Sequence, residues 1–315
     1  MTDSGLVQSP LDSLLQKLNL ERLDRDLFLG DPGEGQFRLF GGMVAAQAVA
    51  AAYRTVPGHG LAAAQGHGVA AEPEASGDGQ VASLHSLHAY FLRPGRYDTP
   101  VRYVVYRIRD GRSFTTRDVV AHQAGEAIFN LSCSFVKPEE GVSHQEPAPS
   151  LPGPERLPAW EFMRPDRREE REMMERWERQ SPIEVRTADP DGPPPGDTPR
   201  RRVWVKPRGE LPDVESVHAA VLAYASDMGL IATARIPHNL PRPSAGHSRF
   251  MGASASLDHA MWFHRPPRFD GWMLYTSESP IAHAARAMIY AQMWREDGVR
   301  VASVVQEGLI RIPRA

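Results

Sequence analysis

The chain has 315 residues, enough for one large domain or two of moderate size, and its 41% hydrophobic and 24% charged residues are ordinary for a globular protein. Its formal net charge of −3 gives no broad attraction to nucleic acid or to an anionic membrane. No run of about 18 apolar residues is present to span a bilayer. Cys133 is the only cysteine, which excludes an intrachain disulfide and a zinc site built from several thiolates.

Both ends of the chain bear on its expected compartment. Residues 1–5, Met-Thr-Asp-Ser-Gly, lack the basic and apolar segments of a secretory leader. Residues 312–315, Ile-Pro-Arg-Ala, are not a peroxisomal tripeptide signal. We therefore expect an intracellular, soluble protein of the cytoplasm or the peroxisome.

Two helices are predicted in the first part of the chain. Leucines recur at helical spacing from Leu11, which predicts an amphipathic helix over Leu11–Leu27 that ends at Asp31-Pro32-Gly33. Met43–Tyr53 follows two glycines and is almost free of polar groups. Its alanines are typical of a buried helix that packs closely against a sheet. Residues 58–80 are rich in Gly and Ala and are interpreted as a surface insertion.

A series of strands follows the insertion. The pattern changes to period two, with aromatic and β-branched residues, and hairpin signals occur at Asp110-Gly111 and Ala124-Gly125. The predicted strands are Val81–Leu92, Val101–Arg107, Phe114–Gln123 and Ala127–Val136. One buried helix followed by antiparallel strands indicates an α+β unit.

Proline then interrupts the regular pattern. Residues 138–199 hold 13 of the 28 prolines, too many for continuous strands or helices, and are interpreted mainly as a connector. Within this stretch Asp166–Gln180 is a charge-rich, solvated helix. Ile183–Arg186 and Val203–Val205 are short candidate strands.

The last third repeats the order of the first. A helix is predicted over Val214–Ile231, and Asp297-Gly298 marks a hairpin between the last two strands. The predicted strands are Ser254–His264, Trp272–Glu278, Ala284–Arg295 and Val299–Arg311.

Two short segments indicate that the chain is internally duplicated. Arg93–Asp98 and Arg265–Asp270 share four of six residues, and an aromatic run containing His-Ala precedes each. Two copies of a helix wrapped by an antiparallel sheet predict a tandem hotdog architecture, of class α+β. We expect an N-terminal repeat over 1–138, a Pro-rich connector over 139–182 and a C-terminal repeat over 183–315.

Asp227 is the first candidate for chemistry. It falls in the last turns of the second central helix, beside the negative end of the helix dipole, and shares a face with Tyr224 and Ile231. A carboxylate partly buried there is expected to have a raised pKa and to need hydrogen-bond partners. The first central helix, 41–53, contains no acidic counterpart. The alternative is an exposed Asp at a frayed helix end.

Ser256 and Gln306 are the next candidates. Ser256 lies near the start of a predicted strand, and Gln306 lies in the apolar last strand, where its amide needs partners. Both could be structural. A carboxylate, a hydroxyl and an amide together suit hydrolysis by an activated water without a covalent intermediate. Gly41 and Gly42 begin a helix whose free N–H groups could bind a thioester carbonyl, or they provide only a tight turn.

The sequence offers little support for other chemistry. No Gly-x-Ser-x-Gly motif is present, which disfavours a serine hydrolase. His85 and His88 would face opposite sides of a strand and have no carboxylate cluster beside them, so no metal is expected. We also expect no cofactor.

Six segments together resemble the acyl-CoA thioesterase II family, whose members are double-hotdog enzymes. They are Leu39–Ala48, His85–Gly95, Arg109–Phe114, Tyr224–Asp227, Leu257–Pro266 and Val305–Gly308. The resemblance implies that Asp227, Ser256 and Gln306 form the water-activating set and that His85 supports it. The insertion at 58–80 and the long connector depart from the family pattern.

The resemblance predicts hydrolysis of fatty acyl-CoA thioesters to free acid and CoA. It further predicts acyl-CoA as the binding partner and assembly as a homodimer or a dimer of dimers. Two alternatives stay open. One is an enoyl-thioester hydratase of the hotdog class, whose usual Asp-x-Asn-x-x-His pattern is absent. The other is a non-catalytic acyl-CoA sensor.

Overall fold

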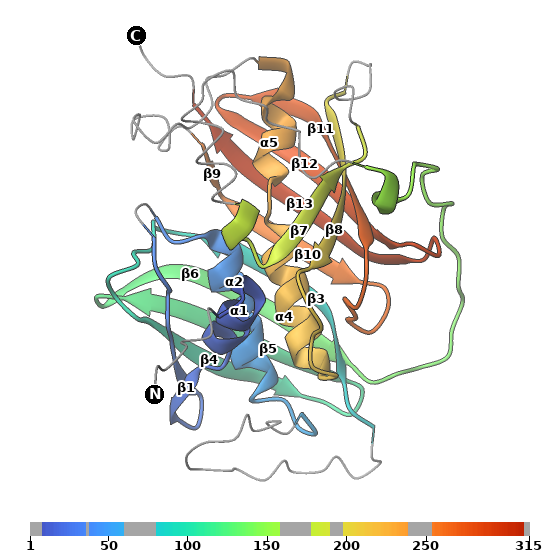
Figure 1. Cartoon of the computed structure of the whole chain (residues 1–315). Coiled ribbons are helices and arrows are strands. Elements are labelled where there is room, and N and C mark those ends of the chain that lie inside the picture. The colour runs from blue at the N-terminus through green and yellow to red at the C-terminus, as the bar shows by residue number, and fades with distance from the viewer. Residues whose placement is uncertain are drawn as a thin grey trace, which may run out of the picture.

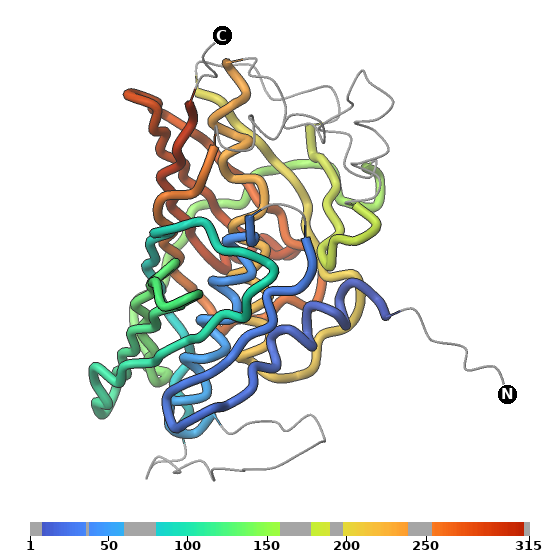
Figure 2. Tube along the Cα trace, turned by 90° about the vertical axis from the view of Figure 1, so that its left-hand side faces the viewer, coloured from blue at the N-terminus to red at the C-terminus, as the bar shows by residue number. Residues whose placement is uncertain are grey.

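The protein was analysed as a computed structural model, in which two central helices lie side by side and are wrapped by one curved sheet (Figure 1). A quarter turn away, the green strands of the first half and the orange and red strands of the second half lie on the same side of these helices (Figure 2). The structure describes residues 8–35, 38–59, 80–157, 178–189, 198–238 and 254–311.

The helices are short, and the two central ones are rich in alanine. Ser9 caps the first helix, where its hydroxyl accepts a hydrogen bond from the Asp12 N–H at 3.1 Å. The α-helices of the described residues are α1 (Pro10–Leu18), α2 (Gly41–Tyr53), α4 (Glu215–Ser226) and α5 (Leu230–Arg235). Short 3₁₀ turns occur at Pro154–Arg156 and Ile236–His238.

The strands in the described part of the chain form a single antiparallel sheet. They are β1 (Glu21–Asp24), β2 (Leu27–Gly30), β3 (Ser83–Phe91), β4 (Val101–Asp110), β5 (Phe114–Gln123), β6 (Glu126–Val136), β7 (Ile183–Thr187), β8 (Arg200–Pro207), β9 (Ser254–Ser256), β10 (Asp258–Phe263), β11 (Met273–His283), β12 (Arg286–Arg295) and β13 (Arg300–Ile310). Their order is β1-β2-β4-β5-β6-β3-β10-β13-β12-β11-β8-β7, with β9 beside β13. The two halves of this order mirror each other about the β3–β10 junction, which confirms the tandem hotdog prediction.

The register of the central strand pair agrees with the duplication in the sequence. Aligning Arg93 with Arg265 places His88 opposite Ala260 in the repeat alignment. The sheet pairs the same two residues, His88 in β3 and Ala260 in β10. A pseudo-twofold axis therefore passes through this pair, and it relates the central helix and strands of the first half to those of the second.

The two central helices cross antiparallel and in close contact. At one end, a Cβ added to Gly42 in α2 would lie 2.6 Å from the backbone oxygen of Tyr224 in α4. At the other end, the Tyr53 hydroxyl donates a 2.9 Å hydrogen bond to Glu215. The N-terminus of each helix therefore lies beside the C-terminus of the other, and only small side chains fit between them.

Gly42→Ala is expected to lower the free energy of unfolding by about 1–3 kcal/mol, because the new methyl group meets a backbone oxygen that cannot rotate away. Urea denaturation would measure the loss. Gly271→Ala is the matched control, since its Cβ would have no neighbour within 4 Å. Equal stability of the two variants would contradict the close crossing.

Several predicted elements have different bounds in the structure. The helix expected over 11–27 ends at Leu18, and β1 and β2 form a hairpin that covers the free edge of β4. The leucine spacing continued beyond the real end of the helix and was misleading. The helix expected over 214–231 ends at Ser226, because Gly229 adopts a left-handed conformation with φ +76° before α5 begins.

The bounds of several strands also differ from the predicted ones. The strand predicted over 254–264 is interrupted at Leu257, so β9 pairs only with β13 while β10 pairs with both β13 and β3. The strand predicted over 272–278 continues to His283, the chain turns at Ala284-Ala285, both with positive φ, and β12 begins at Arg286 instead of Ala284. Elsewhere β5 has the predicted bounds, and β4 and β8 extend beyond theirs.

Part of the expected connector is packed against the C-terminal half. Ala148, Leu151 and Leu157 join a second hydrophobic cluster, whose other members are Ala188, Trp204, Trp272, Leu274 and Trp294. Of the insertion predicted over 58–80, residues 60–79 lie outside the described residues. The helix predicted over 166–180 also lies outside them, except that 178–180 are helical. The division at residues 138 and 183 stays a prediction.

Among the described residues, one helical stretch, 215–238, is apolar and long enough to cross a membrane by length and composition alone. However, 72% of its apolar window is buried inside the protein, and it is broken at Gly229. Core helices of globular proteins meet the same criterion, so the stretch is interpreted as the core helix of the second half.

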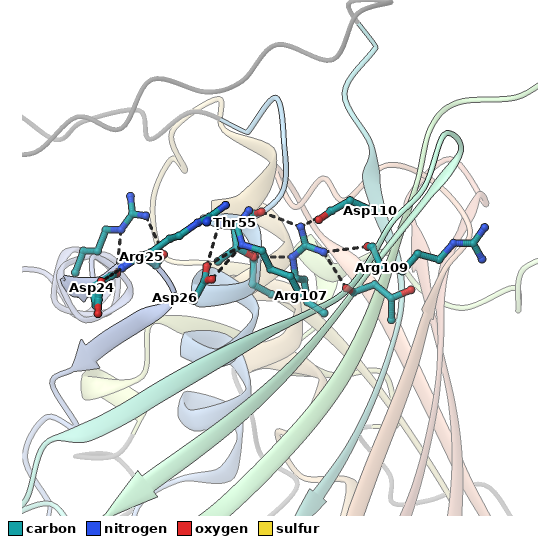
Figure 3. A network of polar contacts seen from close by, with 11 residues as sticks. Asp24, Arg25, Asp26, Thr55, Arg107, Arg109 and Asp110 are labelled. Atoms are coloured by element: carbon teal, nitrogen blue, oxygen red, sulfur yellow. Dashed lines mark hydrogen bonds and ion pairs between the residues drawn. The ribbon is translucent and has the colours of Figure 1, made fainter.

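A network of charged and polar groups lies at the end of α2 opposite Gly42. The buried Arg117 guanidinium donates hydrogen bonds to the Thr55 hydroxyl and backbone oxygen, each at 2.9 Å, and pairs with Asp110. Figure 3 shows Thr55 and Asp110 in this network, with the Arg107–Asp26 pair beside them. The network ties the C-terminus of α2 to strands β4 and β5.

Candidate active site

Asp227 is buried where α4 ends. It is the C-cap residue of α4 and is only 8% exposed, which excludes the alternative of an exposed, frayed helix end. The N-terminus of α2 faces its carboxylate: a Cβ added to Gly41 would lie 2.9 Å from Asp227 Oδ2, and the Gly42 N–H hydrogen-bonds the carboxylate. The positive end of the α2 dipole thus partly offsets the unfavourable end of α4.

The structure brings the three predicted side chains together. Ser256 Oγ donates a hydrogen bond to Asp227 Oδ1 at 3.1 Å, and Gln306 Nε2 donates to Ser256 Oγ at 2.8 Å. Ser256 ends β9 opposite Gly308 of β13, two residues beyond Gln306. The interruption of the strand at Leu257 makes this local pairing separate from β10. The three residues therefore form one continuous hydrogen-bonded set.

Burial dominates the electrostatics of the carboxylate. Loss of solvation raises the pKa of Asp227 above its ordinary value. Hydrogen bonds from Ser256, Gly42 and Gln306 and the electrostatic influence of His259 act in the opposite direction. The groups that interact electrostatically with Asp227 further include Arg38, Tyr224 and Tyr275. A carboxylate whose pKa is raised in this way is better suited to accept a proton near neutral pH.

A cavity of about 640 Å³ opens beside this carboxylate. Asp227, Ser256 and Gly41 contribute to its lining, while Gln306 does not. Its remaining wall is largely aromatic and aliphatic, formed by Leu39, Phe40, Val44, Phe91, Tyr97, Ile128, Phe129 and Ile231. An apolar cavity with a few polar groups at one point is typical of a small-molecule site.

The other predicted residues have different outcomes. Gly41 lines the cavity, but Gly42 directs its N–H to Asp227 and is not part of the lining. His85 packs edge-on against Phe114, with ring centroids 5.7 Å apart. Within the described part of the chain, no hydrogen bond joins His85 to Asp227, Ser256 or Gln306. The structure thus leaves His85 outside the set, and a supporting role for it stays a prediction.

Sequence reasoning missed His259 and Ser226. His259 is 1% exposed, and its ring lies within 2.8 Å of both Gln306 Oε1 and Ser226 Oγ. A signal was available, because His259 alternates with the core residues Met261 and Phe263 and therefore faces inward. Arg38, which lines the cavity and donates to the Ser254 backbone oxygen, was also missed.

The symmetry-related position in the first half lacks this polar set. The repeat alignment places Leu84 at the position of Ser256 and Leu87 at that of His259. Cys133 takes the position of Gln306, because Ser132 pairs with His88 as Val305 pairs with Ala260. The candidate site therefore belongs to the second half, with the N-terminus of α2 as the contribution of the first. No group of three or more metal-ligating residues occurs among the described positions.

The fold places the chain in the class of double-hotdog proteins. Two family descriptions match it: the acyl-CoA thioesterase N-terminal domain over residues 31–136 and the acyl-CoA thioesterase C-terminal domain over residues 149–310. The chain therefore belongs to the acyl-CoA thioesterase family.

Similar proteins match along nearly the whole chain. Acyl-coenzyme A thioesterase 8 of Rattus norvegicus is 35% identical, over 98% of this chain and 92% of the relative. Acyl-CoA thioesterase 2 of Haemophilus influenzae is 33% identical, over 96% and 98%. A solved acyl-CoA thioesterase II of Mycobacterium marinum is 35% identical and superposes with a TM-score of 0.71, covering 95% of this chain and 98% of that one.

Proposed function

We propose that this enzyme hydrolyses fatty acyl-CoA thioesters to free fatty acid and CoA by an activated water, with Asp227 as the general base. The observation that carries the mechanism is the buried carboxylate of Asp227 at the wall of an apolar cavity. It accepts a hydrogen bond from Ser256, which in turn accepts one from Gln306, a residue outside the cavity lining. Membership of the acyl-CoA thioesterase family supports the substrate class.

In this proposal each group has a role that is consistent with its position. Ser256 hydrogen-bonds Oδ1 of Asp227 and leaves Oδ2, beside Gly41, to accept a proton from water. The water oxygen attacks the thioester carbon, the negative charge develops on the carbonyl oxygen, and the Gly41 N–H at the start of α2 stabilises it. The C–S bond then breaks, and protonated Asp227 returns its proton to the departing thiolate. No covalent acyl-enzyme is formed.

The cavity wall supports a fatty acyl group as the substrate's apolar part. Phe40, Phe91 and Phe129 contribute aromatic surface, and the acyl chain would bury against it. A thiol-trapping assay across acyl-CoA chain lengths tests the proposal directly. Release of CoA with saturation kinetics is expected. Binding of acyl-CoA without any thiol release would support the sensor alternative, and addition of water across an enoyl-CoA would support the hydratase.

As the pH is lowered, activity should fall at a higher pH than it would if the general base were an Asp with an ordinary pKa. Asp227 must be ionised to accept a proton, and burial raises its pKa, so kcat/KM should fall as the pH drops through that raised value. Ser256→Ala removes a hydrogen bond that lowers the pKa of Asp227 and should move the acid limb to still higher pH. A pH–rate profile measures both. An unshifted limb in Ser256→Ala would contradict the assigned contact.

The finer points of organisation are also part of this proposal. The division into 1–138, 139–182 and 183–315, assembly as a homodimer or dimer of dimers, and a cytoplasmic or peroxisomal location all rest on sequence reasoning. Light scattering of the purified protein tests the assembly.

A further inference from the structure

The buried ring of His259 lies behind the residues that line the cavity. Its Nδ1 is 2.8 Å from Gln306 Oε1, and its Nε2 is 2.8 Å from Ser226 Oγ. Ser226 directly precedes Asp227 in the chain. The hydrogen bonds therefore form a closed ring that runs from Asp227 through Ser256, Gln306 and His259 to Ser226 and back to Asp227 through the peptide bond.

The hydrogen bond from Gln306 to Ser256 sets the orientation of the Gln306 amide in this ring. Nε2 of Gln306 donates to Ser256 Oγ, so the amide oxygen Oε1 is the atom that faces His259. A carbonyl oxygen only accepts, which requires a hydrogen on Nδ1 of His259. The Ser256 hydroxyl, having accepted from Gln306, is free to donate its own hydrogen to Asp227.

A flipped Gln306 amide would break this arrangement. Its oxygen would then face Ser256, and the serine hydrogen would turn toward Gln306 and away from Asp227. The carboxylate would lose the contact that orients it. The oxygen and the NH2 group of an amide have similar size, so packing alone does not distinguish them. The direction of the whole chain of hydrogen bonds therefore depends on a donor at the His259 position.

The first half of the protein shows that the fold itself does not need a histidine here. Leu87 holds the symmetry-related position, and Cys133 stands in place of Gln306. Both are buried in the main hydrophobic core. A histidine is present only in the half whose facing strand carries the glutamine, which indicates a role that is tied to that amide.

We propose that His259 is a positioning residue that fixes the amide orientation of Gln306 and thereby directs the Ser256 hydrogen to Asp227, with Ser226 holding the other side of the ring. The inference rests on the proposed function. It assigns His259 no contact with substrate, because His259 is not part of the cavity lining.

Three substitutions separate this role from simple packing. Asparagine can place an amide N–H near the Nδ1 position, whereas glutamine reaches the Nε2 position and leucine supplies no donor. His259→Leu and His259→Gln should lower kcat by about 10- to 100-fold with KM changed less than about twofold, because substrate contacts are intact while the base is misoriented. His259→Asn should retain activity within about fivefold of wild type.

The pH–rate profile provides a readout that packing alone would not move. Loss of the contacts from Ser256 and Gln306 should shift the acid limb to higher pH in His259→Leu, and His259→Asn should restore it, since both contacts lower the pKa of Asp227. His88→Leu is the matched control, because this exposed histidine of β3 pairs with Ala260 and faces away from the core. It should leave kcat and the pH profile unchanged.

The experiments on His259 can fail independently of the proposed hydrolytic mechanism. Wild-type kcat in His259→Leu, or equal activity of His259→Asn and His259→Gln, would overturn the positioning role while an inactive Asp227→Asn still supports the mechanism. If His259→Leu does not fold, the comparison of the Asn and Gln variants decides the question. An active Asp227→Asn would overturn the proposed mechanism itself.

Discussion

Asp227→Asn is expected to lower kcat for acyl-CoA hydrolysis by roughly 10²–10⁴-fold, the range that a positioned general base contributes. Asparagine keeps the shape and can still accept the hydrogen bond from Ser256, so the cavity should be preserved and KM should change little. Steady-state kinetics with a thiol-trapping reagent measures the effect. A variant with wild-type turnover would remove Asp227 from the mechanism.

The same substitution should not lower thermal stability. Because burial raises the pKa of Asp227, the folded state binds this proton more tightly than the unfolded chain does. Stability contributed by the group is therefore present at low pH and is lost as the pH rises from the ordinary value through the raised one. Asparagine avoids ionisation, and its Tm at neutral pH should equal or exceed that of the wild type.

Glu215→Gln is the matched control at the opposite end of α4. Glu215 accepts hydrogen bonds from Tyr53 at 2.9 Å and from Ser83 at 2.7 Å, and it lies in the first turn, where the helix dipole favours a negative charge. Loss of this charge in Glu215→Gln should lower the free energy of unfolding by about 1 kcal/mol and leave kcat unchanged. Asp227→Asn should thus lower activity without lowering stability, whereas Glu215→Gln should lower stability without lowering activity.

Arg117→Met is expected to lower the free energy of unfolding by about 3–5 kcal/mol, the range for removing one partner of a buried charged network. The Arg117 side chain is fully buried, and its five N–H groups contact Thr55, Arg109, Thr116 and Asp110. Methionine fills much of the volume but leaves backbone oxygens of Thr55, Arg109 and Thr116 without these donors.

The midpoint of urea denaturation at constant m-value measures this loss. Arg107→Met is the control, because the adjacent Arg107–Asp26 pair is partly exposed and should contribute about 1 kcal/mol or less (Figure 3). Equal losses in the two variants would contradict the interpretation of Arg117. Activity of the folded Arg117→Met enzyme should stay near wild type, since Arg117 lies in the half without the polar set.

The duplication could be inferred from the sequence because it depends on local patterns that occur twice. Arg93-Pro94 and Arg265-Pro266 end equivalent strands, and each alanine-rich helix precedes its own set of strands. Period-two alternation located β5 with its correct bounds. The leucine spacing after Leu18 failed, because a periodic pattern does not reveal that β4 needs a neighbour along its free edge.

Asp227, Ser256 and Gln306 could likewise be named as candidates from the sequence, because Asp227 and Gln306 are polar residues in apolar segments and the family resemblance includes all three. Their contact is decided only by the tertiary structure. This contact requires α4 to end before Gly229 and the strand to be interrupted at Leu257. The sequence patterns ran without a break over 214–231 and 254–264 and therefore indicated neither feature.

By itself the sequence determined the tandem repeat, the central helices and the half that carries the carboxylate, since these follow from periodicity and composition along short stretches. Only the tertiary structure decided that α2 directs its N-terminus at Asp227, that His259 contacts Gln306, and that Arg117 contacts Thr55 at the C-terminal end of α2. The physical reason is that the antiparallel crossing of α2 and α4 and the pairing of β3 with β10 join residues far apart in the chain.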